Sequence, residues 1–295
     1  KASLLQEQKQ TFDRLHQMFI DGMSKDKSSH DVIFKYIMEK PKVVTAYLQA
    51  EMPKPLVEQI DWNTLTYEPT NLGSPMVNEK RADILISLQL KSTEKIYVYF
   101  MFEHQSTDVH SMAWRFYEYL YLWYSNYIKN IHNGKFPHKL PFVFPLVLYN
   151  GLKAWESPTS LQDLIDVPPN CSEYAPHLSF HLRDLSQTDD ADIQQQYAQS
   201  FLLAKFAEYF KYSRHPSFYD RLQVDEQFVL LKQESGDTLL SIYLYIIQTY
   251  KGPQPISKML DSKLTTENNM IDLIKQWKDE GRNEGIEQGF EHGIE

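Results

Sequence analysis

The stretch 82–106 (ADILISLQLKSTEKIYVYFMFEHQS) holds two apolar runs separated by a short polar segment. The runs cover 82–90 and 96–104, and the polar residues between them are suited to a turn. Two such runs predict a β-hairpin. The second run is apolar or aromatic on both faces, which is typical of a buried central strand.

The rest of the hydrophobic pattern predicts helices and strands on both sides of this hairpin. The predicted helices cover 28–39, 43–51, 108–130, 193–212, 225–250 (with a break near 235–237) and 256–263, and a last one starts near 266. The other predicted strands cover 60–70, 141–149 and 177–185. A strand, a long helix and a second strand form a crossover, which is right-handed with the two strands parallel. The order predicts an α/β fold in which a mixed β-sheet is flanked by helices, with an α-helical C-terminal region.

These elements divide the chain into four predicted regions. They are a helical lead-in over 1–27, an α/β domain over 28–188, a helical cap over 189–252, and a C-terminal helix and tail over 253–295. The tail repeats glycine at positions 281, 285, 289 and 293. On a helix these glycines form a bare stripe that a second helix can approach, so the C-terminal helices are the expected route to a homo-oligomer. The alternative is a frayed tail, since each glycine costs about 1 kcal/mol in a helix.

Composition and charge limit the cellular compartment and the classes of function that the sequence predicts. The chain has 295 residues, 42% of them hydrophobic, which is ample for a large core. A single cysteine, Cys171, together with the lack of a membrane-length apolar stretch or a signal peptide, predicts a cytoplasmic protein without membrane contact. Residues 1–150 carry 17 basic and 16 acidic side chains, whereas the remainder carries 13 and 23. This balance argues against a generic nucleic-acid coat and leaves a metal-dependent enzyme open.

The hairpin brings two acidic residues together. When the turn is centred on Thr93, Asp83 lies ten positions before the centre and Glu103 ten positions after it. Directly opposed residues have Cβ atoms roughly 4.5–5.5 Å apart, and two carboxylates at that distance repel unless a positive charge lies between them. Magnesium prefers such oxygen ligands. Gln105 is two residues beyond Glu103 and therefore points from the same face.

Two simpler interpretations compete with a metal site. A shift of one residue in the register moves Glu103 to the other face, and strand ends often carry acids for solubility. The apolar character of the second strand favours the metal, because a glutamate at the end of a buried strand is costly unless it is paired or coordinated.

Other polar residues have ordinary explanations beside functional ones. Asp31 at a helix start suits the helix dipole and can pair with Lys35. Arg115 and Lys129 are candidates for phosphate contacts, with solvated or ion-paired roles as the alternative. The scattered histidines, among them His104 and His110, do not have the spacing of a zinc site.

Four segments together resemble a known family. They are HDVIFK at 30–35, RADILISL at 81–88, YFMFEHQS at 99–106 and PLVLYNG at 145–151. They resemble the Rpn family of recombination-promoting nucleases, also called YhgA-like transposases, within the PD-(D/E)XK nuclease superfamily. The resemblance covers roughly 28–230 and implies an αβββαβ core, which matches the order predicted above.

The resemblance also implies roles for individual residues. Asp83 is the motif aspartate, Glu103 is the motif glutamate, and Gln105 occupies the position that is usually lysine. Asp31 matches the family's HD element and assists metal binding by that analogy. The backbone carbonyl of His104 is the third expected ligand of Mg²⁺, for which Mn²⁺ is a possible substitute. The neutral Gln105 departs from the superfamily pattern and removes a positive charge.

The implied function is a Mg²⁺-dependent endodeoxyribonuclease, with DNA as its substrate, that promotes recombination or mobile-element activity. One alternative is a catalytically inactive nuclease-fold protein that binds a partner. Another is a DDE-type transposase. That chemistry needs a third carboxylate and usually a basic DNA-binding module, and the chain has no helix-turn-helix with clustered Lys and Arg.

Overall fold

The computed structural model describes residues 29–70, 83–92, 97–131, 133–234 and 236–263. The predicted lead-in helix, the hairpin turn around Thr93 and the glycine-repeat tail lie outside the described residues. The chain forms two compact units, of which one comprises 34–211 and the other joins 29–33 to the part that follows 211. None of the helices described here is long and apolar enough to cross a membrane.

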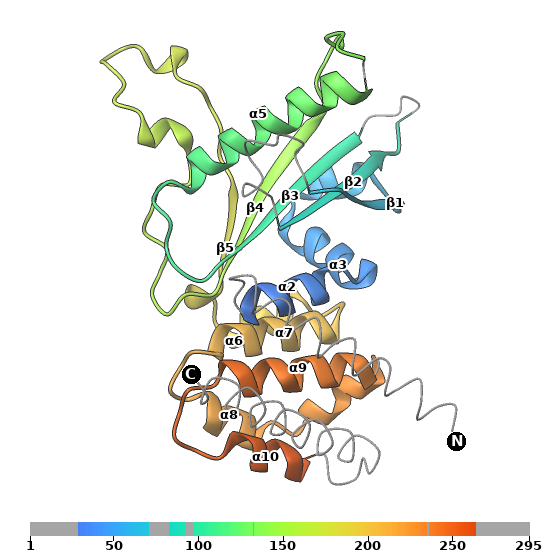
Figure 1. Cartoon of the computed structure of the whole chain (residues 1–295), viewed down its shortest axis with the longest axis vertical. Helices are drawn as coiled ribbons and strands as arrows, with labels where there is room; N and C mark the ends of the chain where they lie inside the picture. Colours follow the sequence, from blue (N-terminus) through green and yellow to red (C-terminus); the bar gives the residue numbers. More distant parts are fainter. Residues whose placement is uncertain (1–28, 71–82, 93–96, 132, 235, 264–295) are drawn as a thin grey trace, which may run out of the picture. The chain divides into compact units, whose positions relative to one another are not determined.

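The larger unit is built on a five-stranded mixed sheet (Figure 1). Its strands are β1 (Ile60–Glu68), β2 (Ile84–Leu90), β3 (Tyr97–Gln105), β4 (Phe142–Tyr149) and β5 (His181–Asp184), in that spatial order. The pairs β1–β2 and β2–β3 are antiparallel, whereas β3–β4 and β4–β5 are parallel. The predicted hairpin and the predicted parallel crossover are therefore confirmed.

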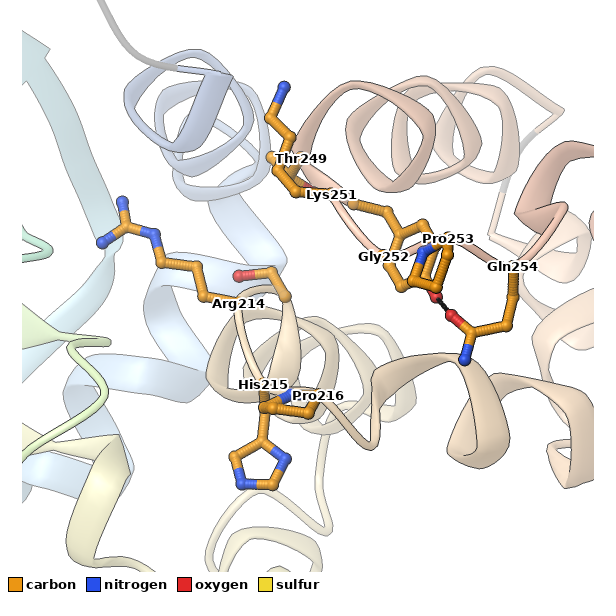
Figure 2. A pocket seen from close by; sticks show the side chains of 10 residues that line it. Arg214, His215, Pro216, Thr249, Lys251, Gly252, Pro253 and Gln254 are labelled. Carbon is orange, nitrogen blue, oxygen red and sulfur yellow. Dashed lines mark hydrogen bonds between the residues drawn. The ribbon is translucent and has the colours of Figure 1, made fainter.

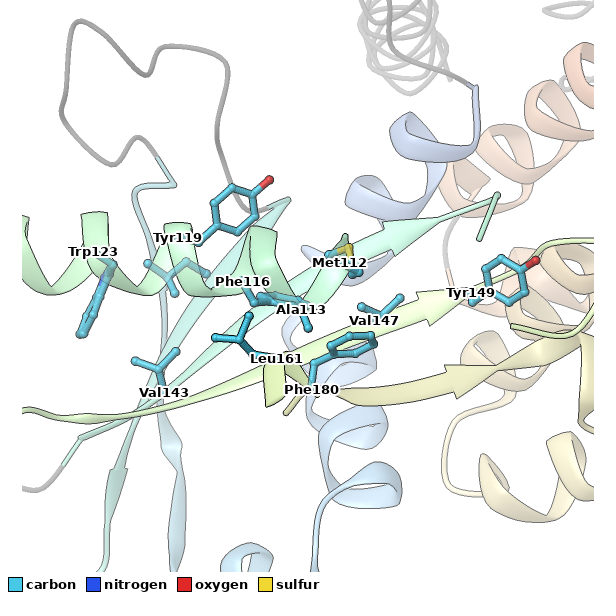
Figure 3. Close-up of a cluster of buried hydrophobic side chains, with 11 residues drawn as sticks. Met112, Ala113, Phe116, Tyr119, Trp123, Val143, Val147, Tyr149, Leu161 and Phe180 are labelled. Carbon is cyan, nitrogen blue, oxygen red and sulfur yellow. The ribbon is translucent and has the colours of Figure 1, made fainter. Parts of the chain in front are cut away.

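Helix α5 (Met112–Ile131) makes the crossover and covers one face of the sheet (Figure 1). Its buried side chains, such as Phe116, pack on Val147 of β4 and Phe180 beside β5 (Figure 3). Burial of such apolar area contributes roughly 25 cal/mol per Å². These apolar contacts fix the helix against the sheet that carries the acidic pair.

The other face of the sheet is covered by α3 (Pro41–Glu51), α7 (Phe201–Tyr212) and the second half of α2 (Ser29–Met38). The ring of Phe102 on β3 lies 4.9 Å from that of Phe34 and 4.8 Å from that of Tyr47, centroid to centroid. Successive side chains of a strand alternate between faces. Phe102 and His104 therefore belong to this core, whereas Glu103 and Gln105 point towards α5.

Two helical predictions were wrong in detail. The predicted helix over 193–212 is two helices, α6 (Asp190–Gln196) and α7, because the Ser200 hydroxyl accepts a hydrogen bond from the N–H of Leu203 (3.2 Å) and starts a new helix. The first half of the predicted helix over 225–250 is a 3-10 helix, and α9 follows it. The structure also has a short helix, α4, that was not predicted, and its first turn contains Pro55, since proline is favoured there. The remaining helices are α4 (Lys54–Gln59), α8 (Phe218–Val224), α9 (Gly236–Thr249) and α10 (Ile256–Lys263).

A buried carboxylate joins α3, β5 and α6. The side chain of Glu51 is fully buried, and Arg183 donates to both of its oxygens at 2.8 Å. His181 lies 2.8 Å from Oε2, and Gln196 and Tyr197 donate to Oε1 at 2.8 and 2.7 Å. Burial alone would raise the pKa of Glu51, but its hydrogen bonds and the charge of Arg183 lower it below the ordinary glutamate value.

We expect Glu51→Gln to lower the free energy of unfolding by about 3–5 kcal/mol at pH 7, because it leaves the buried donors without their anion. The lowered pKa means that this stabilisation is fully present above the ordinary glutamate pKa of about 4.3 and is lost as the pH falls through the folded-state pKa. Urea unfolding at several pH values measures it.

The matched control is Glu58→Gln, since Glu58 is exposed in α4. It should unfold like the parent at every pH. A Glu51→Gln protein as stable as the parent at pH 7 would contradict a role for this carboxylate in joining the three elements.

Candidate active site at the β2–β3 hairpin

The register of the hairpin places Asp83 opposite Glu103. Ile84 pairs with Phe102, so the next position outward pairs the two acids. The backbone N–H of Asp83 donates to Glu103 Oε1 at 3.2 Å. The predicted opposition is thus confirmed, and the alternative shift by one residue is excluded. The roles of the two acids as metal ligands stay predictions.

The Asp83 carboxylate is held by one backbone and one side-chain donor. Its Oδ2 accepts a hydrogen bond from the N–H of His104 at 2.9 Å. Its Oδ1 lies 3.2 Å from Nζ of Lys35 on α2. One fifth of the Asp83 side chain is exposed, so this carboxylate lies at the solvent edge of the pair.

The Glu103 carboxylate is almost completely buried and meets a second cation. Its Oε2 lies 3.3 Å from a terminal nitrogen of Arg115, in the first turn of α5. The same oxygen accepts from Nε2 of Gln105 at 3.5 Å, which confirms that Gln105 shares the face of Glu103. Arg115 also donates to the hydroxyl of Tyr119 at 3.1 Å. Tyr119 was not among the residues predicted for the site, although its spacing of four residues from Arg115 on a helix signals a contact.

The electrostatic balance of the pair leaves Glu103 difficult to ionise. Burial raises the pKa of Glu103 well above its ordinary value, and the neighbouring charge of Asp83 raises it further. Arg115 and Lys35 oppose this shift but do not reverse it. Burial also raises the pKa of Tyr119, so its hydroxyl remains protonated.

The imidazole of His104 points away from the acidic pair. Asn150 donates through Nδ2 to the carbonyl of Phe210, so its Oδ1, 3.0 Å from Nε2 of His104, accepts a hydrogen bond from the ring N–H. The ring packs 4.8 Å from that of Phe210. His104 can therefore serve the site only through its backbone.

The two residues of the HD element lie in the first turns of α2, in the other compact unit. Arg214 donates through Nε to Nε2 of His30 at 2.9 Å, and arginine has no acceptor. The proton of the neutral imidazole is therefore on Nδ1, which lies 2.8 Å from the Tyr245 hydroxyl. His30 thus tethers α2 to α9 in this unit, while Asp31 follows it in the first turn of the helix.

The acidic pair fits a hard divalent cation on chemical grounds. Two opposed carboxylates offer oxygen ligands, and burial together with the charge of Asp83 keeps the pKa of Glu103 raised despite Arg115 and Lys35, so a further cation would stabilise the ionised pair. Among the described residues, no group of three or more His, Cys, Asp and Glu side chains is close enough to hold a metal ion. The pair would therefore need the backbone carbonyl predicted at His104, or water, to complete the coordination.

Two pockets lie apart from these carboxylates. A cavity of about 430 Å³ is lined by Trp114 and Tyr117 of α5 and by apolar residues of the loop after β4. A cavity of about 380 Å³ in the other unit lies between the turns at 213–216 and 249–254. Figure 2 shows that Arg214 and Lys251 extend in different directions from the second pocket, so they do not converge on a common ligand.

Comparison with known proteins places the chain in a family. The family model described as "Putative transposase, YhgA-like" matches residues 28–227. The chain therefore belongs to the YhgA-like transposase family. The matched region includes both strands that form the acidic pair.

Relatives in this family carry different functional names. The inactive recombination-promoting nuclease-like protein RpnE of Escherichia coli K12 is 24% identical over 272 residues, 90% of this chain and 87% of that protein. The recombination-promoting nuclease RpnC of the same strain is 26% identical over 259 residues, 85% and 81% of the two chains. The recombination-promoting nuclease RpnD of Escherichia coli O157:H7 is 28% identical over 167 residues, 56% of this chain and 62% of that protein. No solved structure matches the chain.

We expect Glu103→Gln to raise the free energy of unfolding at pH 8 by about 0.5–2 kcal/mol, within the range of stabilising single substitutions. The amide keeps the shape of the side chain and removes a buried charge next to Asp83. The raised pKa sets the sign, because the cost of ionising Glu103 is absent below the ordinary glutamate pKa and grows as the pH rises above it. Denaturant unfolding at pH 4 and pH 8 measures the difference.

The gain should be small at pH 4, where Glu103 of the parent is protonated. The exposed Glu58→Gln should show no such dependence on pH. A Glu103→Gln protein that is less stable than the parent at pH 8 would mean that Arg115 outweighs burial and the charge of Asp83.

Proposed function

We propose that this member of the YhgA-like family is a Mg²⁺-dependent endodeoxyribonuclease that promotes DNA recombination. The observation that carries the proposal is the opposition of Asp83 and the buried Glu103 at the end of a central strand. Two carboxylates held side by side at the end of a buried strand offer the oxygen ligands that a hard divalent cation prefers. Relatives named recombination-promoting nucleases support the choice of reaction.

The carboxylates of Asp83 and Glu103, with the backbone carbonyl of His104, would hold the metal ion. When bound, Mg²⁺ would polarise the scissile phosphate, lower the pKa of an attacking water and stabilise the leaving oxygen. The backbone N–H groups of His104 and Asp83 fix the two carboxylates in orientation at 2.9 and 3.2 Å. The protein thus supplies a preorganised pair of carboxyl groups at one end of the hairpin.

Gln105 has the role of orienting the attacking water in this proposal. Its Nε2 is turned towards Glu103 Oε2, which directs the amide oxygen away from the carboxylate. An amide oxygen can accept a hydrogen bond from water and hold it near the metal ligands. The amide is neutral, so it does not stabilise the negative charge of the phosphate as the usual lysine would.

A catalytically inactive protein that binds a partner is the second candidate. The observation that favours it is that both carboxylates already meet cations, since Lys35 contacts Asp83 and Arg115 contacts Glu103. A metal ion must compete with these two contacts. The name of the relative RpnE, an inactive nuclease-like protein, is consistent with loss of activity within the family. A DDE-type transposase has less support, because the described residues offer no third carboxylate beside the pair.

We expect Asp83→Ala and Glu103→Gln each to abolish Mg²⁺-dependent nicking of supercoiled plasmid, because each removes a ligand oxygen. Conversion of supercoiled to open-circular DNA in Mg²⁺, in Ca²⁺ and in chelator measures the activity. Since Glu103→Gln is expected to stabilise the fold, its loss of activity cannot be attributed to unfolding.

The matched control is Asp166→Ala, which removes an exposed aspartate from the loop after β4 and should cut at the parental rate. A parent protein that neither cuts DNA nor shows a Mg²⁺- or Mn²⁺-dependent thermal shift would favour the inactive candidate. An Asp83→Ala protein that cuts as fast as the parent would exclude this site.

A further inference from the structure

We propose that Arg115 binds the scissile phosphate and supplies the positive charge that Gln105 does not provide. This inference rests on the proposed nuclease function and names the group that recognises its phosphodiester substrate. The charge would come from the crossover helix α5 and not from strand β3. The local sequence of β3 does not indicate that a residue of α5 takes over this charge.

Arg115 bridges the buried acid and the solvent. One of its terminal nitrogens contacts both Glu103 Oε2 at 3.3 Å and the hydroxyl of Tyr119 at 3.1 Å. About a third of the Arg115 side chain is exposed (32%), whereas the Glu103 side chain is 3% exposed. Because a guanidinium has five N–H donors, the contacts through one nitrogen leave Nε and the other terminal nitrogen for phosphate oxygens. Arginine suits this task, since its planar fork can engage a phosphate through two parallel hydrogen bonds.

Tyr119 fixes the position of this guanidinium. The Tyr119 side chain is buried against the sheet, and its ring centroid lies 5.9 Å from the central carbon of the Arg115 guanidinium. The hydroxyl accepts from the arginine, so it holds the cation without neutralising it. Tyr119 is therefore a positioning residue, and the charge next to Glu103 is preorganised before substrate arrives.

Lys35 is the other cation at the site, and it is less suited to this role. Its Nζ contacts Asp83 Oδ1, at the more exposed carboxylate. It is a point charge on a flexible stem and cannot form the two-pronged contact. Among the described residues, no aromatic ring is seen to hold Lys35 in place as Tyr119 holds Arg115.

The test compares Arg115→Gln with Lys42→Gln, which removes a charge from the exposed first turn of α3. We expect Arg115→Gln to slow nicking in Mg²⁺ by about 10²–10³-fold, the usual effect of removing one preorganised donor to a transition-state oxygen. It should also weaken binding of a short DNA duplex in Ca²⁺, measured by fluorescence anisotropy. The affinity for Mg²⁺ alone, measured by calorimetry, should rise, because a cation that competes for Glu103 is gone. Lys42→Gln should match the parent in all three measurements.

A rescue experiment tests the replacement of the motif lysine directly. We expect the double variant Arg115→Gln/Gln105→Lys to nick plasmid at least tenfold faster than Arg115→Gln alone, because residue 105 points from the same face as Glu103. This outcome is not expected if Arg115 only supports the fold, since a lysine on β3 would not repair the packing of α5.

The outcomes separate this inference from the proposed function. An Arg115→Gln protein with parental nicking and parental DNA affinity overturns the inference while leaving the nuclease intact. A drop in Mg²⁺ affinity together with a lower melting temperature also overturns it, because that combination indicates a structural role. If the parent does not cut DNA, the proposed function fails, and the duplex-binding measurement still decides whether Arg115 contacts phosphate.

Discussion

The burial of a second carboxylate beside Asp83 is the constraint on which the organisation of the larger unit depends. Glu103 lies near the end of a central strand that is covered by helices on both faces, so its carboxylate has little access to water. Burial of an ionised group without compensation is costly. The chain compensates partly, with Lys35 from one flanking helix and Arg115 from the other. The pKa of Glu103 nevertheless remains raised, because burial and the charge of Asp83 outweigh the two cations.

The contrast with Glu51 separates a structural carboxylate from a functional one. Both glutamates are buried and both contact an arginine. The donors around Glu51 are numerous enough to lower its pKa, whereas the neighbouring Asp83 helps to raise that of Glu103. A like-charged neighbour at a buried position costs stability, and carboxyl groups with such perturbed pKa values are concentrated at functional sites. This difference supports a ligand for the Asp83–Glu103 pair and a purely architectural role for Glu51.

The local pattern predicted the hairpin, its register and the parallel crossover, because period-2 alternation and turn position are properties of neighbouring residues. It could not predict partners that are distant in sequence. Glu51 contacts residues 130 to 146 positions away, and no spacing rule connects them. Lys35 is similar, since the sequence pairs it with Asp31 one turn away and gives no sign of its contact with Asp83. The restart of α7 at Ser200 was missed because the periodicity of the apolar residues continues across the break.

The proposed source of positive charge at the site, Arg115, depends on the packing of the core. A lysine on β3 would be fixed by the strand that carries Glu103, and its position would depend on backbone pairing alone. Arg115 instead depends on the packing of α5, whose first turns are fixed by buried residues such as Met112 and Phe116 (Figure 3). Protein cores are packed about as densely as crystals of small organic molecules, so they hold a helix in one position. A displacement of α5 would therefore also displace Arg115. The position of the guanidinium is thus set by the same apolar contacts that stabilise the sheet, and the chemistry of the acidic pair is coupled to the packing of the crossover helix.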